Sequence, residues 1–381
     1  MDRIRKCAVS NICGGCQLQD LDYSEQLNYK QQKINQLFNK IIEPKTIIGA
    51  DDPYHYRNKV QVAFGYEKKR VICGNYVEST HRIVEIKDCQ LANQKANEII
   101  SDIKNLAVTF KIPIFNEYNY QGCLRHVMVR LSETTGQIMV ILVTGSYVFP
   151  RKKDFIKSLL KKQPQITTIV QSINNRHTSM VLSDKFEVWY GKGYIEDKLN
   201  NLFFRISPTS FYQVNSKQVI KLYDCAIKAA KLKKNEIIMD AYCGTGTIGL
   251  SLAKAVKKVI GVELNKDAIR DAKINAKNNQ ITNAEFICAD AGNYMQKMAA
   301  EKEKIDVVIM DPPRAGADNK FLNALVKLRP QKVIYISCNP YTQKGNINYL
   351  LKHFYKLESI QPVDMFPFTE HTETVAVLKH I

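Results

Sequence analysis

The chain has 381 residues, 45% of them hydrophobic, and a formal net charge of +18 at pH 7. This length predicts two or three domains, and the longest apolar run, residues 138–143, is far too short to span a bilayer. The N-terminus is charged and no apolar segment follows it, so we expect no signal peptide and a cytoplasmic protein. So large an excess of cations favours a nucleic acid as partner over an anionic membrane surface.

Ten cysteines in a cytoplasmic chain do not indicate a set of disulfides. Cys7, Cys13 and Cys16 are clustered, with two glycines between the last two. Closely spaced thiolates of this kind are typical of a metal or iron–sulfur site. The fourth ligand that we favour is Cys89, at the expected end of a strand, and Cys73 is its competitor. We predict an iron–sulfur site, with zinc as the main alternative because four thiolates suit it equally well.

Residues 23–40 have the spacing of an amphipathic helix, since Leu27, Ile34, Leu37 and Phe38 fall on one stripe. We expect the Gln, Asn and Lys side chains of this helix to form its solvated face.

Aromatic and basic residues alternate over residues 52–59, where Arg57 and Lys59 come directly before the pattern of a strand. This combination suits stacking on unpaired RNA bases with phosphate contacts nearby; an ordinary edge strand with charged ends is the alternative. Short strands continue to about residue 190, with helices near 90–107 and 151–161. We therefore expect a central α+β domain with an antiparallel sheet.

Strands and helices alternate regularly from residue 236 onward. The expected strands are residues 237–240, 259–262, 285–288, 305–310 and 332–337, followed by a hairpin of residues 355–360 and 374–378. This alternation predicts an α/β fold with a doubly wound, parallel sheet and an antiparallel edge. We expect regular structure to stop at Pro340, because proline lacks an N–H and restricts the residue before it.

Glycines and carboxylates stand where these strands end. Gly244 and Gly246 follow the first strand and let the backbone approach a ligand closely. Glu263 ends the second strand, about twenty residues on, where a carboxylate can hold ribose hydroxyls, and Asp290 ends the third. Dinucleotide binding is the first alternative, but that fold repeats its mononucleotide half. A smaller nucleoside ligand such as S-adenosylmethionine fits the sequence better.

Asp311 and Cys338 end the fourth and fifth strands. A free cysteine is most often a small buried hydrophobe, but at this sheet edge it can be a nucleophile. A thiolate that adds to C6 of a pyrimidine turns C5 into a carbon that can accept a methyl group. A base must then remove the C5 proton; Glu373 is our candidate and His371 is the runner-up.

Four motifs together resemble the RNA uracil-C5 methyltransferase family. They are Asp-Pro-Pro-Arg at 311–314, Ser-Cys-Asn-Pro at 337–340, His-Thr-Glu-Thr at 371–374 and Ser-Phe-Tyr-Gln-Val-Asn at 210–215. The resemblance covers nearly the whole chain. It implies a class I S-adenosylmethionine-dependent methyltransferase domain, an α+β RNA-binding domain and an N-terminal iron–sulfur segment. We expect the boundaries 1–50, 51–200 and 201–381, with Cys89 joining the first part.

The same resemblance implies the site residues. Cys338 would be the nucleophile and Glu373 the base, and Phe211 would line the pocket for an extruded base. It implies S-adenosylmethionine contacts at Gln213, Tyr242, Thr247, Glu263, Asp290 and Asp311. It implies that the ligands of a [4Fe-4S] cluster are Cys7, Cys13, Cys16 and Cys89.

The expected substrate is a uridine in 23S rRNA, and a tRNA T-loop uridine is the alternative. Cytosine is less favoured, because residues 311–318 contain no cysteine, which cytosine enzymes usually place there. A non-catalytic iron–sulfur RNA-binding protein is the alternative of a different class. Many ribosomal members begin with a small β-barrel RNA-binding domain, which we expect to be missing because the first cysteine is Cys7. No obligate protein partner is evident.

Overall fold

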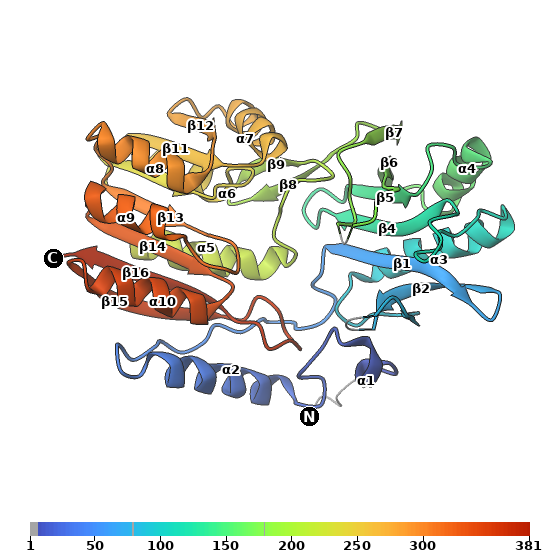
Figure 1. Ribbon diagram of the computed structural model, residues 1–381, viewed down its shortest axis with the longest axis horizontal. Helices are drawn as coiled ribbons and strands as arrows, with labels where there is room; N and C mark the ends of the chain where they lie inside the picture. The colour runs from blue at the N-terminus through green and yellow to red at the C-terminus, as the bar shows by residue number, and fades with distance from the viewer. Residues whose placement is uncertain (1–6, 78–79, 179) are drawn as a thin grey trace. The chain divides into compact units, whose positions relative to one another are not determined.

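The computed structural model describes residues 7–77, 80–178 and 180–381, which form two compact units (Figure 1). The first unit contains the described residues of Met1–Asp20, Asp52–Lys198 and Ile206–Thr209. The second unit contains Leu21–Asp51, Leu199–Arg205 and Ser210–Ile381. The expected N-terminal part is thus divided, because its cysteines belong to the first unit and the helix after them to the second.

A seven-stranded sheet in the order β3-β2-β1-β4-β5-β6-β7 forms the first unit. Its strands are β1 (Lys59–Glu67), β2 (Arg70–Tyr76), β3 (Ile83–Glu85), β4 (Leu124–Leu131), β5 (Ile138–Thr144), β6 (Ile166–Ile173) and β7 (Phe186–Tyr190). Among the described strands of this sheet only β5 and β6 pair in parallel, so the expectation of an antiparallel sheet was wrong for this pair. The helix α4 (Lys152–Lys162) lies between them in the chain and supplies the long crossover that a parallel pair requires.

The two long helices of the first unit cover one face of its sheet. Ile99 and Ile103 of α3 (Gln94–Thr109) and Phe155 of α4 are fully buried in one cluster with Val127 and Val129 of β4. Side chains alternate along a strand, so Met128, between these valines, points to the opposite face. The short helix α1 (Ser10–Cys13) belongs to the same unit.

The second unit is built on a seven-stranded sheet in the order β12-β11-β10-β13-β14-β16-β15. Its strands are β10 (Ile237–Ala241), β11 (Lys258–Glu263), β12 (Ala284–Cys288), β13 (Val307–Met310), β14 (Lys332–Ser337), β15 (Tyr355–Val363) and β16 (Glu373–His380). Its helices are α2 (Tyr23–Phe38), α5 (Ser216–Ala230), α6 (Thr247–Leu252), η1 (Ala253–Ala255), α7 (Lys266–Asn278), α8 (Ala291–Ala300), α9 (Asn319–Leu328) and α10 (Pro340–Leu351). The sequence does not foresee α8, α10 or the separate two-stranded sheet of β8 (Ile195–Leu199) and β9 (Leu202–Ile206).

This topology fixes where a ligand can bind. β10 pairs in parallel with both β11 and β13, so the order of the strands reverses beside β10. In doubly wound sheets the ligand site lies at such a switch point, outside the carboxyl ends of the strands. The hairpin of β15 and β16 forms the antiparallel edge that was expected, with β16 against β14.

The prediction that regular structure stops at Pro340 was wrong. The strand β14 ends at Ser337, but Pro340 is the first residue of α10. Proline is well suited to this position, because its fixed φ suits a helix and an N–H there would have no helical partner. Asn339 caps the helix, since its side chain accepts a hydrogen bond from the Tyr341 amide at 3.2 Å.

The helix α2 forms as expected, but its predicted solvated face is partly buried. Asp22 and Glu25 form a capping box at its start. Gln26 and Lys30 are completely buried, and the Lys30 ammonium donates to the Asp364 carboxylate at 2.6 Å. A charge can be buried when it is paired and hydrogen-bonded, and periodicity does not reveal such a partner.

Candidate active site

A turn held by a buried carboxylate follows β10. Asp240, 1% exposed, accepts a hydrogen bond from the Gly249 amide at 2.8 Å. Burial raises the pKa of Asp240 to about 7, and the charges of Asp311 and Glu263 add to this effect. Gly246 has a φ of 81°, a conformation that favours glycine, and a Cβ there would lie 2.9 Å from the Phe286 ring. Sequence reasoning missed Asp240, although its place at the end of an apolar strand was a signal.

Five of the predicted site residues line one cavity in the second unit: Phe211, Gln213, Tyr242, Thr247 and Asp311. The Tyr223 hydroxyl, which sequence reasoning missed, lies 3.2 Å from the Thr247 hydroxyl at the same cavity. Phe211 remains 61% exposed although it lines the cavity. The structure thus brings together four of the six residues predicted to contact S-adenosylmethionine.

Of the other two, Glu263 is the last residue of β11 and Asp290 follows the neighbouring strand β12. Glu263 accepts hydrogen bonds from the Gly244 amide at 3.2 Å and the Asn265 amide at 2.8 Å. Asp290 caps α8 by accepting from the Asn293 amide at 2.9 Å. Both carboxylates are oriented by the backbone at the sheet edge where a nucleoside would bind.

The nucleophile candidate lies beside the base candidate. Ser337 is the register partner of Thr374 in the β14–β16 pair, so Cys338 and Glu373 are neighbours across these two strands. Burial raises the pKa of the half-buried Cys338 thiol to about 11; the negative charges of Glu373 and Asp311 add to the rise, and Arg314 opposes it.

Two carboxyl groups, of Glu373 and Asp311, lie within electrostatic range of each other and of this thiol. Glu373 is 3% exposed, and burial together with the charge of Asp311 raises its pKa well above the ordinary value, against the opposing effect of Arg314. Burial likewise raises the pKa of Asp311 to about 7. Neighbouring carboxylates resist double ionisation, so the pair keeps a proton at a pH where isolated carboxyls have lost theirs.

A guanidinium and an imidazole complete the surroundings. Arg314 Nη2 lies 3.0 Å from His371 Nδ1. A guanidinium can only donate and a neutral imidazole has one acceptor nitrogen, so the acceptor of His371 is already engaged. The Arg314 carbonyl accepts from the side chains of Asn339 at 3.0 Å and Thr342 at 3.1 Å, which ties it to the start of α10. Sequence reasoning gave Arg314 no role.

The four predicted cluster ligands gather in the first unit. Burial raises the pKa of Cys16 to about 12, and Cys89, Cys13 and Cys7 each raise it further, so all four thiols are within electrostatic range. Burial also raises the pKa of Cys73, to about 11, but no other cysteine contributes to that rise. The donor chemistry of the four fits an iron–sulfur cluster. Within the described ranges, however, no three His, Cys, Asp or Glu side chains have the spacing of a metal site.

Arg57 and Lys59 line a cavity of about 400 Å³ in the first unit, together with Lys87 and Lys104. None of the described residues that line it is acidic. Burial, with the nearby charges of Arg130 and Arg57, lowers the pKa of Lys59 to about 8. Cations held this close to one another favour binding of an anion.

None of the helices in the described part of the chain has the length and apolar character that crossing a membrane requires.

Comparisons with known proteins agree with this geometry. A family model described as tRNA (Uracil-5-)-methyltransferase matches residues 22–381. Uncharacterized RNA methyltransferases of Clostridium tetani and Halalkalibacterium halodurans are each 40% identical, over 98% and 99% of this chain and 82% and 84% of theirs. The crystal structure of Pyrococcus abyssi tRNA (uracil-54, C5)-methyltransferase with S-adenosyl-L-homocysteine is similar, with a TM-score of 0.81 and 30% identity over 96% of this chain and 84% of that one. The chain therefore belongs to the RNA uracil-5-methyltransferase family and is an S-adenosylmethionine-dependent RNA methyltransferase of mixed α/β fold.

Proposed function

We propose that this enzyme methylates C5 of a specific uridine in 23S rRNA through a covalent bond between Cys338 and C6. The observation that most supports the covalent chemistry is the β14–β16 register, which makes Cys338 and Glu373 neighbours at the ends of these strands. A nitrogen methyltransferase needs no such pair, because an amino nitrogen already carries a lone pair. A uracil C5 needs both a nucleophile and a base.

In the proposed reaction the Cys338 thiolate adds to C6, and C5 becomes the nucleophilic carbon of an enolate. S-adenosylmethionine, when held by residues such as Gln213 and Thr247, supplies the methyl group. Glu373 then takes the C5 proton, the C5–C6 double bond forms again, and the C6–S bond breaks to release the thiolate. Phe211, exposed at the edge of the cavity, would stack against the extruded uracil.

The surroundings of Glu373 suit it to this role. A carboxylate whose pKa is raised by burial binds a proton more strongly than an ordinary carboxylate does. His371, the runner-up, already uses its acceptor nitrogen with Arg314. We therefore assign the base to Glu373 and a neighbouring, electrostatic role to Arg314.

The cluster is proposed on the donor set, with Cys7, Cys13, Cys16 and Cys89 as ligands. Bonded to iron, these thiolates would cross-link the N-terminal segment to the residues before α3. The cavity that contains Arg57 and Lys59 is also lined by Cys89, so the cluster would hold one wall of this cationic cavity, which we propose binds phosphates of the RNA. No step of methyl transfer involves it.

A tRNA T-loop uridine is the second candidate substrate. Two observations favour it: the structurally similar Pyrococcus abyssi enzyme is named for uracil 54 of tRNA, and the family description names tRNA. Both substrates would use the same chemistry.

Mass spectrometry of nucleosides from a deletion strain tests the proposal. We expect one or more 5-methyluridines to disappear from 23S rRNA and to return when the wild-type gene, but not a Cys338→Ala gene, is restored. Loss from tRNA alone would establish the second candidate. If 5-methyluridine is unchanged in both RNAs, the proposed function is wrong.

A further inference from the structure

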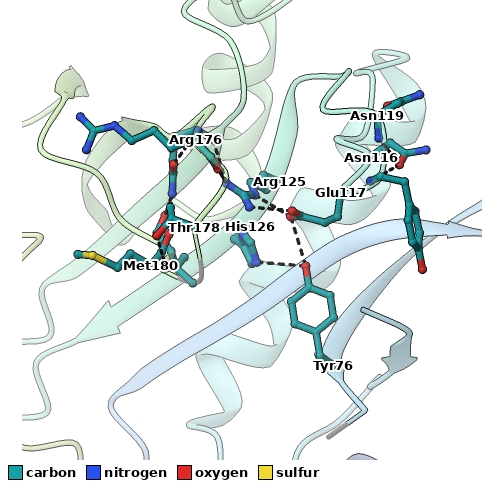
Figure 2. A network of polar contacts seen from close by, with 12 residues as sticks. Tyr76, Asn116, Glu117, Asn119, Arg125, His126, Arg176, Thr178 and Met180 are labelled. Atoms are coloured by element: carbon teal, nitrogen blue, oxygen red, sulfur yellow. Dashed lines mark hydrogen bonds and ion pairs between the residues drawn. The ribbon is translucent and has the colours of Figure 1, made fainter. Parts of the chain in front are cut away.

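The first unit contains a second cavity, of about 360 Å³, which methyl transfer does not use. Tyr76, Glu117, Arg125 and His126 line it and are joined in one polar network (Figure 2). The Arg125 guanidinium binds Glu117 with two bonds, of 2.6 and 2.7 Å. Its remaining nitrogen donates to backbone carbonyls at 3.2 and 3.3 Å. Two-point binding fixes a carboxylate in one orientation, so these walls of the cavity are rigid.

The hydrogen bonds of this network run in one direction, from His126 through Tyr76 to Glu117. Tyr76 Oη lies 3.4 Å from His126 Nε2 and 3.5 Å from the Glu117 carboxylate, to which it donates. His126 is 4% exposed, and its Nδ1 is buried without a hydrogen-bond partner in the described part of the chain. Burial and the charge of Arg125 lower the pKa of His126 to about 4, so the ring is neutral at pH 7. The Tyr76 hydroxyl has one proton and donates it to Glu117, so Nε2 of the neutral His126 ring must carry the proton that it donates to Tyr76, and Nδ1 is unprotonated.

The charges of this cavity therefore cancel. Glu117 and Arg125 neutralise each other and the described lining residues include no lysine. The cavity of Arg57 and Lys59 lies beside it, because Gln61 and Asn75 line both. One cavity is cationic and the next is neutral and polar. A nucleotide has the same two parts, an anionic phosphate and a neutral base.

Ring side chains stand at the edge of the neutral cavity. The His81 ring lies 5.8 Å from the Tyr76 ring and 6.4 Å from the Tyr118 ring, edge to face in both cases. Tyr118 is 82% exposed and lines an adjoining cavity, which shares Tyr76, His81 and Glu117 with this one. Exposed rings beside a polar cavity offer faces on which an unpaired base can stack.

We propose that this cavity, lined by Tyr76, His81, Glu117, Arg125 and His126, binds one unpaired nucleobase of the substrate RNA other than the methylated uridine. The proposal rests on the proposed function for the identity of the RNA. The adjacent cationic cavity would take a neighbouring phosphate. A base held here would help the enzyme to choose its uridine by a second contact with the strand.

Substitutions of exposed residues in the full-length enzyme test the proposal, because they leave the hydrophobic core unchanged. The probe is the synthetic hairpin that carries the methylated uridine, or a tRNA T-arm hairpin if no uridine is methylated. Binding is measured by fluorescence anisotropy with S-adenosylhomocysteine present. His81→Ala and Tyr118→Ala should each weaken binding about tenfold, the usual effect of losing one stacked base. Tyr147 of the same unit is 59% exposed and lines neither this cavity nor the adjoining one that contains Tyr118, so Tyr147→Ala should leave the affinity unchanged.

Abasic RNA then separates base binding from a structural role. Hairpins with one base removed at each position in turn should include one, away from the target uridine, that binds wild-type enzyme about tenfold more weakly. On that hairpin, His81→Ala should cause no further loss. Equal losses on every hairpin, or no loss at all, would overturn the base pocket. Because binding is measured without turnover, this result is independent of whether the methylation assay supports the proposed function.

Discussion

Burial and the charges of two carboxyl groups raise the pKa of the Cys338 thiol, and the charge of Arg314 opposes the rise. Addition to C6 needs the thiolate. Activity should therefore increase as pH rises toward 11, because both the thiol and the carboxyl pair lose protons in this direction. The environment of this one residue thus predicts an enzyme that is more active in alkaline than in neutral solution.

Replacing Arg314 should move that pH dependence. Arg314→Gln removes the positive charge, so the Cys338 pKa rises further and the ascending limb of kcat/KM shifts to higher pH. We expect activity at pH 7.5 to fall by about tenfold, the effect of one pH unit on the thiolate fraction, and to recover partly at higher pH. Arg270→Gln, on the surface of α7, is the matched control. A uniform loss at all pH values would mean that Arg314 acts by positioning instead.

At the scale of one element, the buried ion pair of Lys30 and Asp364 holds α2 to the rest of the second unit. Lys30→Met leaves the Asp364 carboxylate buried without its cation, and we expect unfolding to become easier by about 3 kcal/mol. Lys33→Met breaks the exposed pair of the same helix with Glu370, and should change stability by less than about 1 kcal/mol. Urea denaturation compares the two. Equal changes in the free energy of unfolding would show that burial does not make the Lys30–Asp364 pair more important for stability than the exposed pair.

The proposed iron–sulfur ligands Cys7, Cys13, Cys16 and Cys89 can be tested at the same scale. Protein purified without oxygen should be brown and hold about four irons, as the four-thiolate set implies. Cys89→Ser should lose the colour and Cys73→Ser should keep it, because the Cys73 pKa shows no influence of the other cysteines. A colourless protein with one zinc would contradict the cluster, and the reverse pattern would make Cys73 the fourth ligand.

The elements that sequence predicted best are those defined by local pattern. Each buried parallel strand contains an apolar run with a polar residue at or close to its end, so β14 and the Cys338 that follows it could be placed from the chain alone. Burial of Lys30 could not, because its partner Asp364 lies 334 residues away. The same holds for the network of Tyr76, Glu117 and His126, which joins separate segments that no motif connects. Asp240 and Arg314 acquire their roles only from charges that the fold brings near.

At the scale of the whole molecule, the net charge of +18 should govern RNA binding. Each neutralised phosphate releases counterions, so affinity falls steeply with salt. Substituting both Arg57 and Lys59 with Ala should lower the slope of log K against log salt by about 1.4, which is the value for two contacts on single-stranded RNA. Substituting Lys157 and Lys161 of α4 changes net charge equally and should leave the slope unchanged. Equal slopes for both double variants would place the RNA surface elsewhere.

Covalent catalysis by the whole enzyme predicts that substitutions of Cys338 and Glu373 abolish or slow the reaction at different steps. Cys338→Ala cannot add to C6, so neither product nor a covalent complex should form. Glu373→Gln keeps the shape of the side chain but cannot accept the C5 proton, and turnover should fall by about a hundredfold or more. Addition and methyl transfer still proceed, so the enzyme should remain attached to methylated RNA.

A denaturing gel of Glu373→Gln with substrate RNA and S-adenosylmethionine makes this difference visible. We predict a slowly migrating band of enzyme bound to methylated RNA, absent without S-adenosylmethionine and absent from the Cys338→Ala, Glu373→Gln double variant. Turnover of Glu373→Gln at the wild-type rate would show that Glu373 is not the base and would make His371 the candidate. An inactive Glu373→Gln variant with no trapped RNA would contradict the proposed order of addition, methyl transfer and proton removal.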